Sequence, residues 1–263
     1  MSAISKKLWE GKLPVCFELA SHEVDCPTEP GMLYLMVART SYLTMFSQQI
    51  EEFFNNYINL KQKDEVWFEY NGSPLRWHYP CGVLFDLLCN PATDLPWSIT
   101  VHFQNFPSDV LLRCPGDNAI ESNYMMTLKE ADQIKHKGQV ISNMSRNQHM
   151  QLWHGIRSEN FDEFWTINKK FMEGFEGLCT FRNIPVRVYF QEKLLQRQFA
   201  AEETTLETAL NNFFPNSFSQ DQQTMKVVIQ GISPPLSSSL QWLSENLSYA
   251  DNFLHICVHS IPV

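Results

Sequence analysis

The same order of predicted secondary-structure elements occurs twice in this chain, once near each end. In the first copy, two strands, "LPVCFELA" and "LYLMVART", precede an amphipathic helix over residues 41–58. The segments "EVWFEY", "LRWH", "GVLFDLLC" and "WSITVHF" follow as two strands, a short helix and a last strand. In the second copy, the hairpin "IPVRVYF" and "LLQRQFA" precedes a helix at "TTLETALNNFFP", the strand "MKVVIQG", a short helix at "LQWLSENL" and the strand "NFLHICVHS". The repeated order indicates an internal duplication.

The order of elements is that of the ubiquitin-like β-grasp fold, in which one long helix crosses a mixed sheet. The turn segments agree, because "EYNGSPL" and "IQGISPPL" each stand just before a short helix. Ser41 is the expected N-cap of the first long helix, and Thr204 and Glu207 are spaced as a capping box for the second. The first helix should bury one face, made of Phe46, Ile50, Phe53, Phe54, Tyr57 and Ile58.

Between the two copies the pattern is helical. Predicted helices lie at "NYMMTLKEADQIKHKGQ", near "MSRNQHMQLWHGI" and at "NFDEFWTINKKFM", where Asn160 and Glu163 are placed as a cap pair. The predicted fold class is therefore α+β, with two ubiquitin-like β-grasp domains flanking a helix-rich domain. The expected boundaries are an N-terminal helical segment over 1–12, a first ubiquitin-like domain over 13–110, a helix-rich domain over 111–180 and a second ubiquitin-like domain over 181–263.

The net charge, the lack of long apolar stretches and the cysteine spacing limit which partners and which cellular location the chain can have. The formal net charge is −9, and nucleic-acid binding needs clustered lysine and arginine, so no nucleic-acid partner is expected. No apolar stretch approaches the roughly 20 residues that span a bilayer, and the first residues lack the apolar run of a signal peptide. Seven cysteines without a CxxC pair are typical of reduced thiols. These features predict a soluble, intracellular protein.

No familiar catalytic or metal-binding motif is present. The string "HICVH" places His255, Cys257 and His259 on one face of a strand, but the two histidines would stand roughly 13 Å apart, too far for one ion. We expect this to be a polar strand face, with Phe253, Ile256 and Val258 opposite, and we expect neither a metal site nor a cofactor.

A thiol nucleophile is an alternative to be weighed. Cys81 or Cys89 paired with His78 or His102 would supply one, and such pairs are assembled by folding. Because both cysteines lie in or beside an apolar short helix, small buried thiols are the expected result.

The first central helix carries three lysines. Its predicted buried stripe is Ile120, Tyr124, Leu128, Ala131 and Ile134 or Lys135. Lys129 should be half-sheltered, with its stem along Met125 and with Asp132 holding its ammonium. Lys135 and Lys137 stand toward the helix C-terminus, where positive charge suits the helix dipole. On the residues alone, all three lysines belong to a solvated face.

Several long strings resemble the autophagy-related protein 5 family: "SYLT", "WFEYNGSPLRWHYPCG", "LFDLL", "LPWSITVHF", "LKEADQIKHKGQVI" and "LQWLSENLSYADNFLHI". The resemblance covers nearly the whole chain, in order, and implies two ubiquitin-like domains around a helix-rich one. Members carry one lysine in a "KEAD" context, to which the C-terminal glycine of the ubiquitin-like autophagy-related protein 12 is joined by an isopeptide bond. In this chain that lysine is Lys129. The family implies no catalytic residues of its own, because conjugating enzymes carry the reactive cysteine.

The resemblance also implies a second partner, autophagy-related protein 16, whose N-terminal helix would occupy a groove shared by the three domains. Trp9, Trp77, Tyr79 and Pro80 are candidate walls, and Trp9 stands outside the periodic pattern. The assembled conjugate would act as a ubiquitin-ligase-like factor that promotes lipidation of another ubiquitin-like protein with phosphatidylethanolamine. The expected location is the cytoplasm, with peripheral recruitment to the phagophore membrane. Two alternatives stay open at this point: a non-covalent adaptor without conjugation, and a thiol enzyme.

Overall fold

The structure is a computed structural model that describes residues 2–59, 61, 63–172, 183–191, 193–215, 217–218 and 225–261. These residues form two compact units. We call Gly11–Asn123 the first unit, and Met1–Glu10 together with Tyr124–Val263 the second unit. No helix in the described part of the chain is both long enough and apolar enough to cross a membrane.

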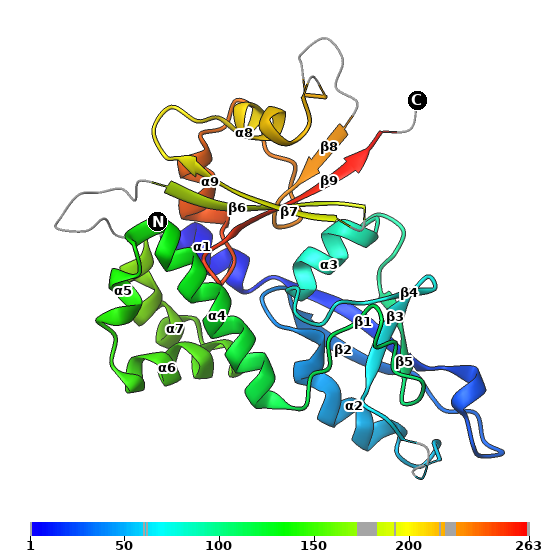
Figure 1. Ribbon diagram of the computed structural model, residues 1–263. Coiled ribbons are helices and arrows are strands. Elements are labelled where there is room, and N and C mark those ends of the chain that lie inside the picture. Colours follow the sequence, from blue (N-terminus) through cyan, green and yellow to red (C-terminus); the bar gives the residue numbers. More distant parts are fainter. Residues whose placement is uncertain are drawn as a thin grey trace. The chain divides into compact units, whose positions relative to one another are not determined.

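The first unit contains a five-stranded sheet in the order β2-β1-β5-β3-β4 (Figure 1). The first and last strands, β1 and β5, are parallel neighbours at its centre, and the other pairs are antiparallel. The strands are β1 (Lys12–Leu19), β2 (Leu33–Ala38), β3 (Trp67–Tyr70), β4 (Ser73–Pro74) and β5 (Trp97–His102). The helical elements are η1 (Ser21–Glu23), η2 (Leu43–Phe46), α2 (Ser47–Phe54) and α3 (Cys81–Leu88). This is the predicted β-grasp arrangement.

Four local predictions in the first unit are wrong. The helix expected over 41–58 is regular only in α2, after the 3-10 turn η2. Ser41 does not cap it, because the Ser41 hydroxyl donates to the Ala38 carbonyl at 2.7 Å and so ties the residue to the end of β2. Phe53, expected inside, is 37% exposed. The strand expected at "LRWH" lies earlier, at β4, because the chain turns back immediately after Tyr70.

The second unit contains a four-stranded sheet in the order β7-β6-β9-β8, again with its first and last strands parallel at the centre. The strands are β6 (Asn183–Phe190), β7 (Lys193–Ala200), β8 (Met225–Val228) and β9 (Leu254–Ser260), and the helices beside them are α8 (Leu206–Phe213) and α9 (Leu240–Leu247). The helices expected at "TTLETALNNFFP" and "LQWLSENL" are confirmed, although the first begins only at Leu206 and ends at Phe213. The cap of α8 is Thr205, not Thr204, because the Thr205 hydroxyl accepts from the Thr208 amide and the Thr204 hydroxyl donates to Ala200.

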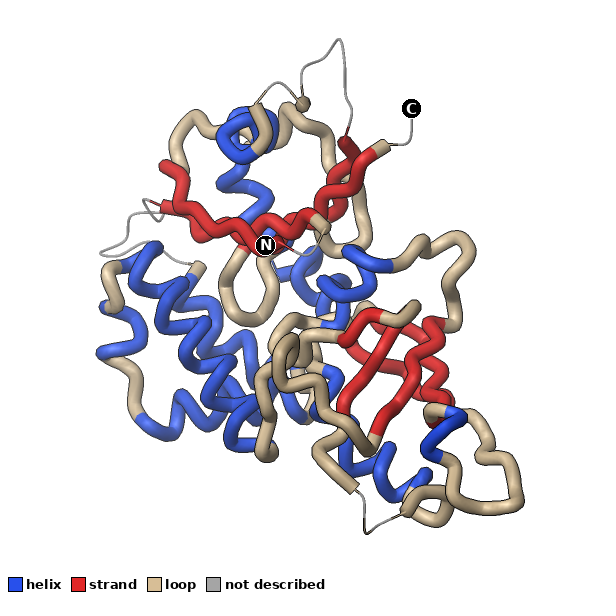
Figure 2. Tube along the Cα trace, turned by 45° about the vertical axis from the view of Figure 1, so that its right-hand side comes forward, coloured by secondary structure: helices blue, strands red, loops and turns tan. Residues whose placement is uncertain are grey.

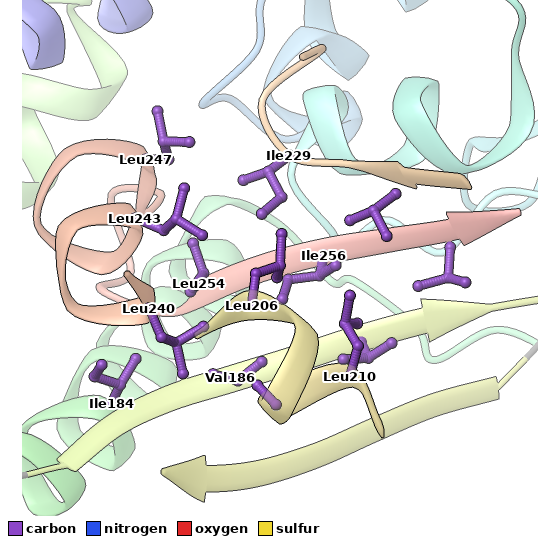
Figure 3. Close-up of a cluster of buried hydrophobic side chains, with 14 of the residues drawn as sticks. Ile184, Val186, Leu206, Leu210, Ile229, Leu240, Leu243, Leu247, Leu254 and Ile256 are labelled. Carbon is purple, nitrogen blue, oxygen red and sulfur yellow. The ribbon is translucent and has the colours of Figure 1, made fainter. Parts of the chain in front are cut away.

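The core of this second β-grasp fold lies between the central strands and the two helices. Figure 3 shows aliphatic side chains from β6 and β9 meeting those of α8 and α9. The labelled members are Ile184, Val186, Leu206, Leu210, Ile229, Leu240, Leu243, Leu247, Leu254 and Ile256. Of these, Leu247 is the most exposed at 2%, so their burial supplies a large part of the stability of the unit.

The two copies share an unusual turn after their third strands. Asn71 and Gly72 have φ angles of 51° and 78°, and Gln230 and Gly231 have 53° and 79°. Two consecutive left-handed residues form the tight hairpin turn that suits the twist of antiparallel strands. The sequence alignment of "EYNGSPL" with "IQGISPPL" therefore matches the same backbone turn in both copies.

The helical region contains α4 (Asp117–His136), α5 (Gln139–Ser142), α6 (Arg146–Arg157), α7 (Phe161–Asn168) and η3 (Lys169–Phe171), and from Tyr124 onward it belongs to the second unit together with α1 (Ser2–Trp9). Figure 2 shows these helices gathered as a bundle. The predicted cap of α7 is confirmed, since the Asn160 side chain accepts from the Glu163 amide at 3.1 Å. A Cβ on Gly155 would stand 2.8 Å from Phe164 atoms, so glycine permits the close packing of α6 on α7.

Candidate functional site

Lys129 lies on the exposed face of α4. The predicted buried stripe of Ile120, Tyr124, Leu128 and Ala131 is confirmed, with no member more than 2% exposed. The Lys129 side chain is exposed and has no hydrogen-bond or ion-pair partner among the residues that the structure describes. The prediction that Lys129 is half-sheltered and held by Asp132 is therefore wrong.

Asp132 faces the interior and fixes the turn from α4 into α5. Its side chain is 0% exposed, and its Oδ2 accepts from the Ile141 amide at 2.8 Å. The Gly138 amide donates to the Asp132 carbonyl, and Lys137 and Gly138 both have positive φ, so the chain reverses tightly here. Burial raises the pKa of Asp132, even though the Ile141 amide and the charge of His136 oppose that rise. The carboxylate therefore serves the local fold and does not hold the lysine.

Glu130, beside Lys129, anchors α4 to the second sheet. Its Oε2 accepts from Arg187 on β6 at 3.0 Å, and its Oε1 accepts from Gln196 on β7 at 2.6 Å. Arg187 also donates to Gln196 at 2.9 Å, and its guanidinium lies 3.9 Å from the Phe253 ring centroid. The four residues "KEAD" therefore have three environments. The Lys129 side chain is exposed and Glu130 binds the sheet. Ala131 and Asp132 are buried.

A buried polar network lies behind Arg187 and contradicts the expected polar strand face at "HICVH". Both His255 and Cys257 are only 2% exposed. His255 contacts Asp251 at 2.9 Å through Nε2 and the Tyr189 hydroxyl at 2.8 Å through Nδ1. Burial opposes ionisation of Asp251, but the charge and hydrogen bond of His255, with Arg187, hold its pKa below the usual value. β9 is a central strand that is covered on both faces. His255 therefore binds buried polar groups and is not part of a solvated surface.

Lys135 is buried, although its charge and position predicted a solvated side chain. It is 4% exposed, and its Nζ lies 3.3 Å from the Asn252 side-chain oxygen and 3.9 Å from the Met172 sulfur. Asn252 in turn donates to Asn168 at 2.7 Å. Burial lowers the pKa of Lys135 to about 7, against the opposing influence of Asp251 and other nearby acids. Lys137, by contrast, is exposed as predicted.

Comparison with known proteins identifies the family. Residues 8–103 match the model described as Autophagy protein ATG5, UblA domain, residues 117–174 match the alpha-helical bundle region, and residues 183–258 match the UblB domain. The chain belongs to the ATG5 family. This membership gives the chain a role in autophagy, and it agrees with the two β-grasp folds and the helical bundle described above.

Individual relatives extend over almost the same length as this ATG5-family chain. Autophagy protein 5 of Drosophila melanogaster is 38% identical over 259 residues, which are 97% of this chain and 96% of that protein. Autophagy-related protein 5 of Caenorhabditis elegans is 31% identical over 96% of each chain. The crystal structure of Kluyveromyces marxianus Atg5 has a TM-score of 0.86, covers 98% of this chain and 100% of its own, and is 23% identical. That structure shows the same fold.

The four predicted groove residues of this ATG5-family chain are interior side chains of their own units. Trp9 belongs to the second unit, is 8% exposed, stacks on Phe164 at 4.6 Å and donates to the Glu159 carbonyl at 3.2 Å. It is thus a packing residue of α1, which corrects its interpretation as a free aromatic anchor. Trp77, Tyr79 and Pro80 lie in the first unit and are also buried, with Trp77 donating to the Leu112 carbonyl at 2.8 Å. The partner groove stays a prediction.

The thiols proposed as nucleophiles are poorly suited to that role. Cys81 is 0% exposed and Cys89 is 8% exposed, and burial raises the pKa of each thiol to about 12. A nucleophilic cysteine needs a low pKa and access to substrate, and neither residue has both. His102, named as a possible base, contacts Glu23 at 3.1 Å instead.

Proposed function

We propose that this chain is the acceptor of a ubiquitin-like modifier, the autophagy-related protein 12, and that Lys129 is the point of attachment. The neutral amine of Lys129 would attack the thioester carbonyl between the C-terminal glycine of the modifier and the cysteine of a conjugating enzyme. The C–S bond breaks, the C–N isopeptide bond forms, the enzyme thiol leaves and the lysine gives up its proton to solvent. The chain supplies the nucleophile and needs no catalytic residue of its own.

The observation that carries this proposal is the placement of Lys129 on an anchored segment of α4. Its amine is exposed and has no competing partner among the described residues, so an enzyme-bound thioester can approach it. The backbone beneath it is held by the bonds of Glu130 to β6 and β7 and by the burial of Ala131 and Asp132. Because the backbone at Lys129 is already fixed, positioning the amine for attack costs little additional conformational entropy.

Membership of the ATG5 family supports the rest of the proposal. The conjugate, together with autophagy-related protein 16, would act as a ubiquitin-ligase-like factor and scaffold that promotes lipidation of a second ubiquitin-like protein with phosphatidylethanolamine. It would work in the cytoplasm and be recruited peripherally to the phagophore membrane. The buried thiols Cys81 and Cys89 favour a scaffold over a thiol enzyme.

An immunoblot of this protein in autophagy-competent cells tests the acceptor. We compare wild type with Lys129→Arg and with two matched controls at exposed lysines of the same unit, Lys137→Arg and Lys170→Arg. We expect a covalently shifted band that disappears only in Lys129→Arg. Lys135→Arg is left out because it is buried, so a lost band there would report misfolding.

Two other outcomes would contradict the proposal. A shifted band that survives Lys129→Arg would place the bond at another lysine. The absence of a shifted band in every variant, with the modifier and its enzymes present, would favour the non-covalent adaptor. Unchanged thermal midpoints of the purified variants show that the arginine substitutions leave the fold intact.

A further inference from the structure

Three metal-ligating side chains gather at one end of the first sheet. His22 and Glu23 belong to η1, which directly follows β1, and His102 is the last residue of β5. Because β1 and β5 are parallel, their carboxyl ends adjoin, and the Ala20 amide donates to the Val101 carbonyl at 3.0 Å. One ligand atom from each of His22, Glu23 and His102 lies within 4.8 Å of the other two.

We propose that His22, Glu23 and His102 form a binding site for a divalent transition-metal ion, with Zn²⁺ as the best fit. Glu23 Oε1 stands 3.1 Å from His102 Nδ1 and 3.8 Å from His22 Nε2. Donors at about 2.0–2.2 Å from a tetrahedral ion stand roughly 3.3–3.6 Å apart, close to both of these distances. The two histidine nitrogens lie within 4.8 Å of each other, so binding an ion would draw the exposed His22 ring toward His102. Two imidazoles and one carboxylate form a donor set that binds zinc and leaves the fourth position open.

The two buried ligands are held in position from behind. Glu23 is 2% exposed, and its second oxygen, Oε2, accepts from the Phe103 amide at 2.6 Å, so Oε1 is the oxygen left for the histidines. His102 is 5% exposed and lies flat on Trp67, with the ring centroids 3.9 Å apart and the planes 9° apart. These contacts restrict both side chains before any ion arrives.

The far nitrogen of His102 provides a second observation. His102 Nε2 is buried and has no hydrogen-bond partner among the described residues, although Glu69 Oε2 lies 3.4 Å away. A histidine that binds a metal through one nitrogen usually donates from the other to a carboxylate. An ion on Nδ1 would fix the tautomer with the proton on Nε2, and a small movement would turn the contact with Glu69 into a hydrogen bond.

A simple buried pair of Glu23 and His102 is the competing explanation. It accounts for two of the three residues but predicts no role for His22, whose side chain is 65% exposed and meets the His102 ring at a centroid distance of 5.7 Å. His22 therefore distinguishes the two explanations.

Titration of the full-length, metal-free protein with Zn²⁺, followed by calorimetry, tests the site. We expect one ion per chain, at least about tenfold weaker binding in His22→Gln and about tenfold weaker binding in Glu69→Gln, whose carboxylate would orient His102. The matched control is His154→Gln, which removes an exposed histidine that also contacts a glutamate, Glu163 at 2.9 Å, and which should leave Zn²⁺ affinity unchanged.

Cobalt absorption checks the ligand type, because Co²⁺ bound by nitrogen and oxygen lacks the thiolate charge-transfer band that bound cysteines would give. The proposal is overturned if wild type binds no Zn²⁺, if His22→Gln binds as tightly as wild type, or if the Co²⁺ spectrum shows thiolate ligation. Because His22 is exposed, His22→Gln should keep the wild-type thermal midpoint in the absence of metal and should lose the rise in midpoint that Zn²⁺ causes in wild type.

Discussion

The two faces of α4 place the same kind of residue in opposite environments. Lys129 extends into solvent without a partner among the described residues, whereas Lys135, farther along the helix, is enclosed and contacts Asn252. Since an α-helix turns by about 100° per residue, the two positions point in different directions from one axis. The exposed face is available for chemistry with another protein, and the buried face joins α4 to the rest of the second unit. The difference shows that a lysine in a helix is not a solvated group by default.

The largest expected effect comes from placing the same new charge on both faces. Lys135→Glu would bury a carboxylate near Asp251, Glu245 and Asp132, and we expect it to cost about 3–5 kcal/mol of unfolding free energy. Lys129→Glu, at an exposed site, should change stability by less than about 0.5 kcal/mol. Urea unfolding of both variants measures the difference. Equal losses would show that the two faces are not distinct.

The next largest loss of stability is expected where Arg187 of β6 holds Glu130 of α4 to the sheet. Arg187→Ala removes the donors to Glu130 and Gln196 and the packing on Phe253, and it leaves Asp251 with less positive charge nearby. We expect a loss of about 2–4 kcal/mol in the free energy of unfolding.

Arg197→Ala, on the neighbouring strand, is the control for Arg187→Ala. Arg197 is exposed and only lies over the Phe213 ring at 5.3 Å, so we expect less than about 1 kcal/mol. A loss as large as that of Arg187→Ala would show that the contacts of Arg187 with Glu130, Gln196 and Phe253 are not the cause of its effect on stability.

The pH dependence of stability should reflect the burial of Lys135. The folded pKa of Lys135 is about 7 and its unfolded value is about 10.4, so between these values the unfolded chain binds a proton that the folded chain has released. The free-energy cost of burying the charged Lys135 is therefore fully present below pH 7, and it is relieved as the pH rises toward 10. The unfolding free energy gains up to about 1.4 kcal/mol per pH unit from this residue.

Lys135→Met should lack that gain. We expect the difference in unfolding free energy, wild type minus variant, to rise between pH 7 and pH 9.5 in urea titrations. The thiols Cys81 and Cys89, whose raised pKa values act in the opposite direction at alkaline pH, are common to both proteins and cancel in the difference. A flat difference curve would contradict a buried Lys135 whose pKa is lowered.

The smallest effect is expected at Glu130. Glu130→Gln keeps an oxygen for a hydrogen bond with Arg187 but loses the charge, and the side chain is 47% exposed. We expect a loss of about 0.5–1 kcal/mol at low salt that shrinks as salt is added. A salt-independent loss would indicate that geometry, not charge, holds α4 to the sheet.

Short-range patterns predicted much of the fold. The β-grasp order, the stripe of α4 from Ile120 to Ala131, the cap at Asn160 and the shared turns after the third strands depend on residues within a few positions of one another. Where two local rules competed, the prediction failed: periodicity put Lys135 or Ile134 on the buried stripe, and the general exposure of charged residues moved Lys135 to the surface.

Contacts between distant residues account for the other differences. Lys135 meets Asn252 across a separation of 117 residues, Trp9 meets Glu159 across 150, and His102 meets Glu23 across 79. Helical or strand periodicity says nothing about such partners. The parallel pairing of β1 with β5, which follows from the predicted fold, places Glu23 near His102, but a metal-binding motif of neighbouring residues cannot contain two ligands that are 79 positions apart.

The discontinuous second unit has a consequence for synthesis on the ribosome. The chain leaves this unit after Glu10 and returns to it at Tyr124. Trp9 therefore emerges early but meets Glu159 only after 150 further residues, about 8–30 s later at 5–20 residues per second. During that interval the apolar face of α1 has no native surface to cover it. The central strand β9 emerges later still, so the nascent second unit exposes apolar surface that chaperones can bind.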